Sequence, residues 1–176
     1  MVERIKRCII AVGSTYFDEL IEALDNETFF TALKQAGFNR LLVQLGKGTY
    51  KPTTLPSLSS LDLQVEVKDF VVLDVLIYHA DLVISHCGAG ILLECLRSDH
   101  ALCIAVVNDS LMGNHQSELA DKLEEDGYIG ASTPKKVLAD VTRVLGEMKA
   151  GMKAFKKYPM KKEQVIVDLI DDLLIN

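Results

Sequence analysis

The stretch SHCGAGILLECL, residues 85–96, decides the predicted fold. It follows the apolar run 82–84 and leads, through two glycines, straight into a second apolar stretch. A buried strand that turns sharply into a helix gives this pattern. Glycine at such a turn has two explanations. Either the loop must be small so that neighbouring segments can pack, or a ligand must come close to its backbone.

Apolar runs alternate with longer amphipathic stretches along the rest of the chain. Short strands are expected over 5–12, 41–45, 63–67, 81–85 and 102–107, with a sixth beginning near 128. Helices are expected over 17–37 with a break near Asp25–Asn26, and over 71–79, 90–97, 114–126 and 134–148. Residues 51–60, rich in Pro, Ser and Thr, are expected to form a surface loop.

Strands separated by helices indicate parallel pairing with right-handed crossovers, and therefore a single Rossmann-like doubly wound α/β sheet. Strands such as CIIAV and CIAVV are apolar almost throughout, as expected where helices cover both faces of a sheet. Residues 1–150 are expected to form this domain. Residues 151–176 hold a basic segment and an amphipathic helix, which would pack on the domain or on a partner.

Composition excludes several classes of protein. The net charge of −6 argues against non-specific nucleic-acid binding, which needs a basic surface. Spanning a bilayer takes roughly 20 apolar residues, which no stretch provides, so a cytosolic location is expected. The four cysteines form no CxxC pair and have no histidine at metal-ligand spacing, and no acidic cluster suggests a bound divalent ion, so no metal is expected. No cofactor is expected either.

The SHCGAG loop follows a strand at the point where ligands bind open parallel sheets, beyond the carboxyl ends of the strands. Backbone amides at a helix start favour an anion such as phosphate. The dinucleotide pattern G-x-G-x-x-G would need glycine where Leu93 stands, and a P-loop would need Ser or Thr where Gly48 stands. Residues 46–49, GKGT, are therefore interpreted as a turn.

Polar groups that could hold a sugar nucleotide follow three of the predicted strands. Glu94, on the first turn of the helix after SHCGAG, has a carboxylate suited to the two hydroxyl donors of a ribose. Asn114, His115 and Gln116 begin the helix after the fifth strand, and amides and imidazoles bind sugar hydroxyls. The first strand ends in the small polar turn 13–15.

Each of these groups also has a purely structural explanation. Glu94 could be a favourable acid near a helix start, and Asn114 could be only an N-cap. His86 and His115 could be ordinary loop histidines. Taken together on one edge of one sheet, they indicate a nucleotide-sugar site.

The blocks DLVISHCGAGILLECL (81–96) and VVNDSLMGNHQSELADKLEEDGY (106–128) carry a family resemblance. They resemble the soluble catalytic subunits of the eukaryotic UDP-N-acetylglucosamine transferase of the dolichol pathway. VGSTYFDELI, residues 12–21, resembles the first loop and helix of the same family. The wider relatives are bacterial lipid-linked N-acetylglucosaminyltransferases of glycosyltransferase family 28, which have the GT-B fold.

The resemblance implies the donor-binding, C-terminal half of a GT-B enzyme. It implies transfer of N-acetylglucosamine from UDP-N-acetylglucosamine to N-acetylglucosaminyl-diphosphodolichol, with inversion, in the second step of lipid-linked oligosaccharide synthesis for N-glycosylation. A membrane-anchored subunit would bind the lipid-linked acceptor in a heterodimer at the cytosolic face of the endoplasmic reticulum. We expect that partner to supply the general base, with His86 and His115 as weaker candidates.

The resemblance also implies roles for individual residues. Contacts to the donor phosphates would come from Gly13, Ser14, Gly88, Ala89 and Gly90, with His86 beside them; contacts to ribose and sugar would come from Glu94, Asn114, His115 and Gln116. Ile91 stands where the family commonly has Ser or Thr, which predicts weaker donor binding. Two alternatives stay open: a non-catalytic nucleotide-sugar scaffold or sensor of the same fold, and an unrelated flavodoxin-like binding module.

Overall fold

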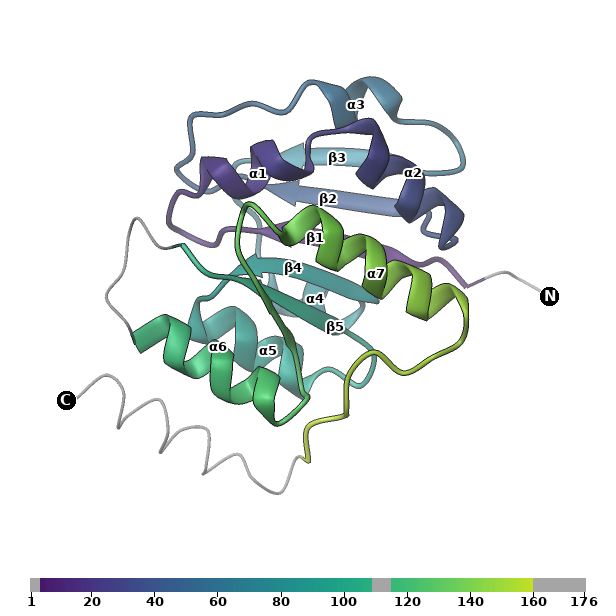
Figure 1. Ribbon diagram of the computed structural model, residues 1–176. Helices are drawn as coiled ribbons and strands as arrows, with labels where there is room; N and C mark the ends of the chain where they lie inside the picture. Colours follow the sequence, from purple (N-terminus) through teal and green to yellow (C-terminus); the bar gives the residue numbers. More distant parts are fainter. Residues whose placement is uncertain (1–3, 109–114, 160–176) are drawn as a thin grey trace.

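Six parallel strands form one sheet in the order β3-β2-β1-β4-β5-β6 (Figure 1). The computed structural model describes residues 4–108 and 115–159, so Asn114 and the predicted C-terminal amphipathic helix lie outside the described residues. The strands are β1 (Arg7–Ala11), β2 (Arg40–Gln44), β3 (Gln64–Lys68), β4 (Leu82–His86), β5 (Leu102–Val106) and β6 (Gly130–Ser132). The predicted doubly wound parallel sheet is confirmed.

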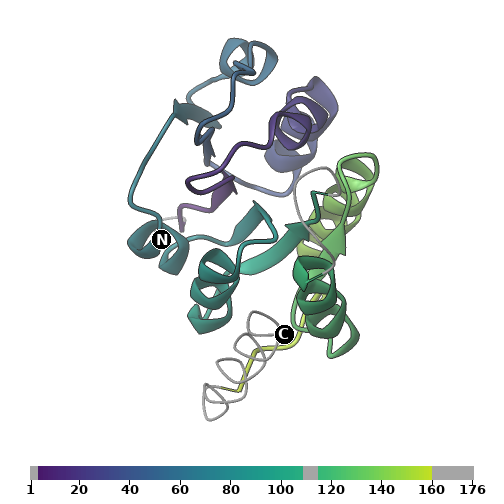
Figure 2. The same cartoon turned by 90° about the vertical axis from the view of Figure 1, so that its left-hand side faces the viewer.

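Helices cover both faces of the sheet, which therefore forms the middle of three layers (Figure 2). They are α1 (Asp18–Leu24), α2 (Glu27–Gln35), α3 (Thr54–Leu58), α4 (Asp74–Tyr78), α5 (Ala89–Arg97), α6 (His115–Glu125) and α7 (Val137–Lys149). One apolar cluster lies under α1, α2 and α7, and the other lies under α4, α5 and α6.

Side-chain alternation along β1 shows why its sequence is apolar after the exposed Arg7. Cys8 and Ile10 belong to the first cluster, whereas Ile9 and Ala11 belong to the second. Each of these four positions is therefore buried against one helical layer or the other. All four cysteines are buried, and none forms a disulfide within the described ranges.

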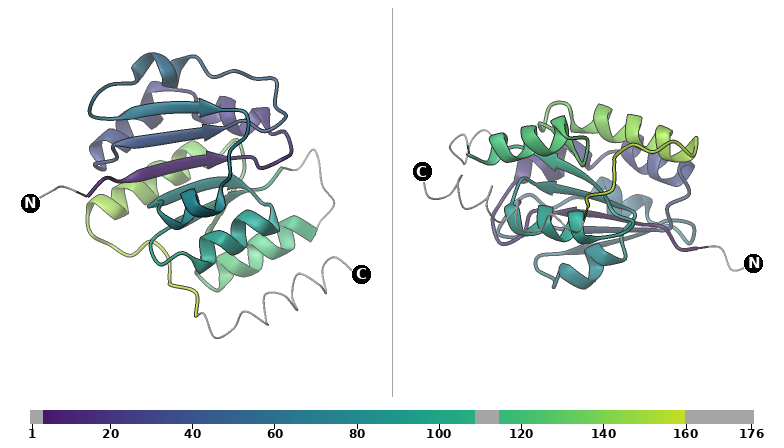
Figure 3. Two further views of the ribbon diagram at one scale, coloured as in Figure 1. Left: turned by 180° about the vertical axis from the view of Figure 1, so that it is seen from behind. Right: turned by 90° about the horizontal axis from the view of Figure 1, so that it is seen from below.

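Helix cover is uneven on the α4 side. Seen from behind, α4 and α5 lie across β4 and β5, while no helix lies across β2 and β3 (Figure 3). The crossover from β3 to β4 contains only the five-residue α4, which is too short to reach these strands. Residues Gln64, Glu66 and Lys68 of β3 are accordingly polar on this face.

The predicted helix break at Asp25–Asn26 is confirmed, and it shapes the following region. Asn26 caps α2 by accepting a 2.9 Å hydrogen bond from the amide of Phe29. The Asp25 carboxylate, 8% exposed, reaches across to the region predicted as a loop. It accepts hydrogen bonds from the Tyr50 hydroxyl and from the amides of Thr53, Thr54 and Leu55.

These bonds explain why the prediction of a loop over 51–60 is wrong in part. The segment contains α3, whose start is fixed by a carboxylate about 30 positions earlier in the chain. Burial by itself would raise the pKa of Asp25, but the four hydrogen bonds lower the pKa overall. The carboxylate is thus charged at neutral pH and acts as a structural anchor.

Replacing Asp25 with alanine should cost about 3 kcal/mol of unfolding free energy, because three backbone amides and a hydroxyl lose a charged acceptor. Urea titration followed by circular dichroism measures this change. Asp62→Ala is the matched control, since that carboxylate is exposed and pairs only with Lys34. Its effect should stay below about 1 kcal/mol. Equal effects for the two variants would contradict an anchoring role for Asp25.

Candidate functional site

The carboxyl ends of the strands form one edge of the sheet, on the left in Figure 1, which we call the rim. Gln44, Ala11, Ser85 and Ala105 are aligned across β2, β1, β4 and β5 near this edge. The loops that follow these strands therefore begin at a common level and lie beside one another. This is where ligands bind in open α/β sheets.

The start of α5 presents free backbone donors at the rim. Gly88 is the N-cap residue, and no side chain caps the helix. Among the described residues, the amides of Ala89, Gly90 and Ile91 have no hydrogen-bond acceptor. The start of α2, by contrast, is capped by Asn26. An uncapped helix start of this kind favours an anion through its amides and its dipole.

The two glycines of this loop serve different purposes. A Cβ atom at Gly88 would lie 2.2 Å from Nε2 of His86, so this position must be small for packing. A Cβ at Gly90 would have no heavy atom within 4 Å, and Gly90 has no positive φ. Neither packing nor backbone conformation therefore explains glycine at position 90. The open space leaves room for a ligand to approach the backbone there, which is the explanation that substitution of Gly90 tests.

His86 lies between the loops after β1 and β4. Its Cε1 atom would be 2.9 Å from a Cβ at Gly13, so both Gly13 and Gly88 make room for the imidazole ring. Burial lowers the pKa of His86, and the nearby Ala11 carbonyl only partly opposes this shift. Two buried polar atoms, Ser85 Oγ and His86 Nδ1, have no hydrogen-bond partner in the described part of the chain. Such atoms are uncommon in cores and tend to occur at functional positions.

The lowered pKa of His86 predicts a pH-dependent stability. Below about pH 6.5 the unfolded chain takes up a proton that the folded chain resists, so the unfolding free energy should fall between about pH 7 and pH 5. One such group changes it by at most about 1.4 kcal/mol per pH unit. Carboxyls with a lowered pKa, such as that of Asp25, reduce the unfolding free energy only at lower pH, below about pH 4.

His86→Asn should flatten this part of the profile, measured by urea titration at a series of pH values. His100→Asn, at an exposed histidine, is the control. If the unfolding free energies of the wild type and His86→Asn change in parallel with pH, the buried imidazole of His86 does not cause the pH dependence of stability.

Gln44, at the end of β2, organises the first loop of the rim. Its Oε1 accepts hydrogen bonds from the amides of Val12 and Gly13, and its Nε2 donates to the carbonyls of Gly13 and Asp69. The Gly13 amide is therefore occupied and does not offer a donor to phosphate. Ser14, also predicted as a phosphate contact, is exposed. Gln44 was not among the residues predicted from the sequence, although a polar residue at the end of the strand RLLVQ is a signal for such a role.

The turn after β2 is joined to the same loop. Gly46 has φ +61°, and a Cβ there would lie 2.2 Å from the Thr15 carbonyl oxygen. The amide of Gly46 donates to the Asp69 carbonyl, and the amide of Lys47 donates to the Thr15 carbonyl, each at 2.8 Å. The turn predicted for GKGT is confirmed, and its position makes it part of the rim.

Ile91 and Glu94 occupy different places from those that the sequence suggested. Ile91 is only 9% exposed and belongs to the core cluster beneath α5, with its Cδ1 near Gly13. Its side chain therefore fills space between two loops. Glu94 lies in the second turn of α5, not in the first as predicted, because the helix begins at Ala89. It forms a 3.2 Å ion pair with Arg97 and stays partly exposed.

The remaining predicted contacts lie on α6 and before it. His115 and Gln116 are the first two residues of α6, next to the rim in sequence order after β5, and their side chains are not described. Asn114 is outside the described residues. Phe70, which the sequence analysis missed, follows β3 at the rim and is 59% exposed, so its ring is available to a flat ligand group.

Neither a metal cluster nor a membrane span is found in the described ranges. Within 4–108 and 115–159, no three His, Cys, Asp or Glu residues are grouped so that they could hold a metal ion. No helix in these ranges is long and apolar enough to cross a bilayer.

A doubly wound parallel sheet with free helix amides at its rim defines a class of α/β domain that binds phosphate-bearing ligands. The model of the glycosyltransferase family 28 C-terminal domain matches residues 7–172. The chain belongs to this family.

Relatives with known names agree with this membership. The chain is 31% identical over 193 residues to the UDP-N-acetylglucosamine transferase subunit ALG13 of Cryptococcus neoformans, and the match covers 94% of this chain and 95% of that protein. It is 41% identical over 125 residues to human ALG13, covering 70% of this chain. The match spans only 11% of the human protein.

Solved structures show the same fold. The solution structure of ALG13 has a TM-score of 0.66 at 25% identity and covers 96% of this chain and 98% of that one. The crystal structure of Acinetobacter baumannii MurG has a TM-score of 0.59 at 20% identity. It is matched over 98% of this chain but only 51% of MurG, so the chain corresponds to about half of that protein.

Proposed function

We propose that this chain is the donor-binding subunit of an inverting N-acetylglucosaminyltransferase. It transfers N-acetylglucosamine from UDP-N-acetylglucosamine to N-acetylglucosaminyl-diphosphodolichol and forms a β-1,4 link. The observation that carries the proposal is the uncapped start of α5, with free amides of Ala89, Gly90 and Ile91, at the rim of a family 28 domain. The relatives named as UDP-N-acetylglucosamine transferase subunits support the choice of donor.

The rim supplies groups for each part of the donor. Amides and the α5 dipole stabilise the diphosphate, and more so as charge develops on the departing UDP. The Glu94 carboxylate gives up its surface ion pair with Arg97 and accepts hydrogen bonds from the ribose hydroxyls. The exposed ring of Phe70 offers a stacking face to the base. His115 and Gln116, with Asn114, contact the sugar.

A second polypeptide is needed for catalysis. The described residues form one domain, which matches about half of the MurG structure, and we assign the acceptor site to another polypeptide. Positioning the two reactants accounts for a large part of a rate enhancement. The partner is a membrane-anchored subunit at the cytosolic face of the endoplasmic reticulum, and it supplies the acceptor site and the general base.

A paired transfer assay tests this proposal. The chain is assayed with UDP-N-acetylglucosamine and the lipid-linked acceptor, alone and after co-expression with the membrane-anchored subunit. We expect chitobiosyl lipid only from the pair. Transfer by the chain alone would contradict the need for a partner, and no binding of UDP or UDP-N-acetylglucosamine in calorimetry would contradict the donor role.

A non-catalytic sensor of the same fold is the second candidate, and Ile91 is the observation that favours it. An isoleucine offers no hydroxyl to a phosphate, and its burial shows that packing fixes it there. Ile91→Thr adds a hydroxyl while keeping a branched side chain, whereas Ile91→Ser would also leave a cavity. If the assembled complex is inactive and Ile91→Thr makes it active, the sensor is the correct function.

A further inference from the structure

We propose that Lys47 provides a positive charge at the rim that contacts a diphosphate. This inference rests on the proposed function and adds a binding residue to it. The sequence gives Lys47 no such role, because GKGT matches no phosphate-binding motif. The hydrogen bonds that fix the 46–49 turn, and the position of the Lys47 ammonium group beside the first loop of the rim, support this role instead.

The backbone on either side of Lys47 is fixed by several contacts. The Gly46 amide is bound to Asp69, and the Lys47 amide is bound to Thr15. A Cβ at Gly48 would lie 2.3 Å from Oδ1 of Asp18, whose carboxylate holds both the amide and the hydroxyl of Thr49. Lys47 therefore leaves the turn from a defined place beside the first loop of the rim.

The ammonium group of Lys47 has no competing partner. Its side chain is exposed and makes no ion pair or hydrogen bond with any described residue. Lys51, four residues further on in the same loop, is neutralised by Asp69 at 2.7 Å. In the described loops that follow β1, β3 and β4, before α5 begins, there is no Lys or Arg.

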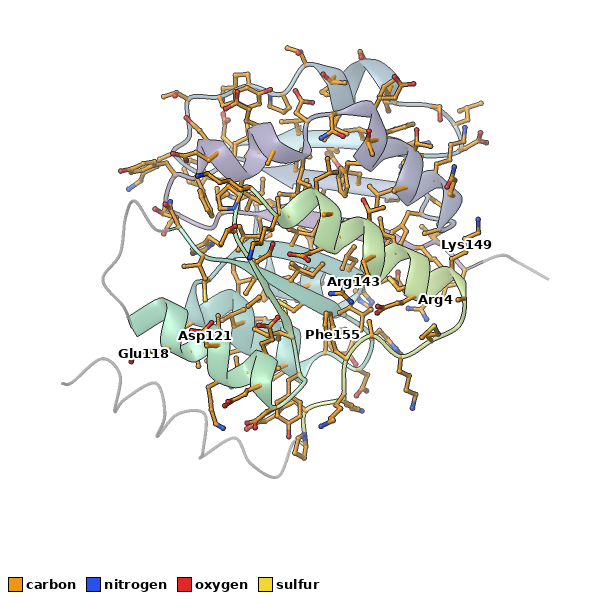
Figure 4. The ribbon with its side chains drawn as sticks, viewed as in Figure 1. Arg4, Glu118, Asp121, Arg143, Lys149 and Phe155 are labelled. Atoms are coloured by element: carbon orange, nitrogen blue, oxygen red, sulfur yellow. The ribbon has the colours of Figure 1, made fainter. Side chains whose placement is uncertain are left out.

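Lys135 and Lys136, which are exposed and follow β6, also lie at the rim, so Lys135→Ala and Lys136→Ala are tested beside Lys47→Ala. Arg4 and Lys149 lie at the opposite edge of the sheet, whereas the acidic residues Glu118 and Asp121 lie on α6 (Figure 4). Lys47 differs from Lys135 and Lys136 in that its turn is joined by hydrogen bonds to the loops after β1 and β3. A lysine acts on phosphates as a point charge, so Lys47 can neutralise one from the flexible end of its side chain.

Two diphosphates meet in the proposed reaction, one in the donor and one in the lipid-linked acceptor. The two sources share the chemistry that Lys47 would recognise. Calorimetry of the isolated chain with UDP reports on the first source. The Michaelis constant for the lipid acceptor, measured with the assembled transferase, reports on the second.

We expect Lys47→Ala to weaken UDP binding about tenfold, or to raise the acceptor KM by a similar factor, which equals about 1.4 kcal/mol. Binding of uridine, which has no phosphate, should not change. The difference should shrink as salt is raised, because exposed charges are screened. Lys47→Arg should restore most of the loss, and the matched control Lys51→Ala should leave both quantities unchanged.

The outcomes separate this inference from the proposed function. If UDP binds the wild type, and Lys47→Ala alters neither UDP affinity nor the acceptor KM, the inference is wrong and the proposed function stands. If the wild type binds no UDP and makes no product with its partner, the proposed function fails. An equal loss with uridine and UDP would show that the substitution acts on the loop and not through charge, and would overturn the inference.

Discussion

Replacing Gly90 with glutamate should reduce the affinity for UDP-N-acetylglucosamine more than a hundredfold and leave the protein at least as stable. A side chain at position 90 enters open space at the start of α5, so it should fold without a clash. An alanine-like gain in helix propensity and an acid near a helix start are both favourable. The new carboxylate would occupy the place of the diphosphate and repel it. Calorimetry and thermal denaturation together measure the two effects.

Gly146→Glu is the matched control for this substitution. Gly146 is also a helical glycine with open space around its Cβ position, but it lies in α7, away from the rim. The Gly146→Glu substitution should change the affinity for UDP-N-acetylglucosamine less than twofold. Undiminished donor binding by Gly90→Glu would show that the ligand does not use the start of α5.

Replacing Glu94 with alanine should lower transfer to below about 1% of the wild-type rate, because it removes two hydrogen bonds from ribose hydroxyls to a charged group, each contributing about 1.5–3 kcal/mol. The wild type should also prefer UDP to 2′-deoxy-UDP, and Glu94→Ala should bind the two equally. Stability should change by less than about 1 kcal/mol, since the Arg97 pair is exposed. Competition binding with the two nucleotides measures the preference directly.

Arg97→Ala provides the control, because it breaks the same ion pair and keeps the carboxylate. We expect its UDP affinity to stay within twofold of the wild type. If Arg97→Ala loses binding as Glu94→Ala does, the ion pair and not the carboxylate is responsible. A large fall in melting temperature for Glu94→Ala would assign the residue a structural role.

Local patterns predicted the strands and helices where neighbours in sequence decide the structure. The break at Asp25–Asn26 follows from an asparagine cap, and the end of α6 follows from Gly127, whose φ is +78°. Helix α3 could not be found this way. Its start is held by the Asp25 carboxylate, which contacts the segment only after the chain has folded.

The site was predictable at the level of its loops and not of its side chains. Parallel strands bring their carboxyl ends to one edge, so SHCGAG, the 13–15 turn and GKGT had to meet there. Sequence could not show that Gly13 donates to Gln44, that Gly88 accommodates His86, or that Ile91 points into the core. Each of these depends on contacts between loops far apart in the chain.

The distinction between Gly88 and Gly90 answers the question that the loop raises. Both glycines read alike in the sequence, yet only one of them is surrounded by atoms. Packing against His86 explains the first. For the second we propose an approaching ligand, which the Gly90→Glu substitution tests.

A crystal structure of the chain with UDP-N-acetylglucosamine bound tests the central claim most directly. We expect diphosphate oxygens within about 3 Å of the amides of Ala89, Gly90 and Ile91, a normal length for such hydrogen bonds. The ribose should lie against Glu94. A nucleotide bound away from the α5 start, or amides at this helix start that make no contact with it, would contradict the account.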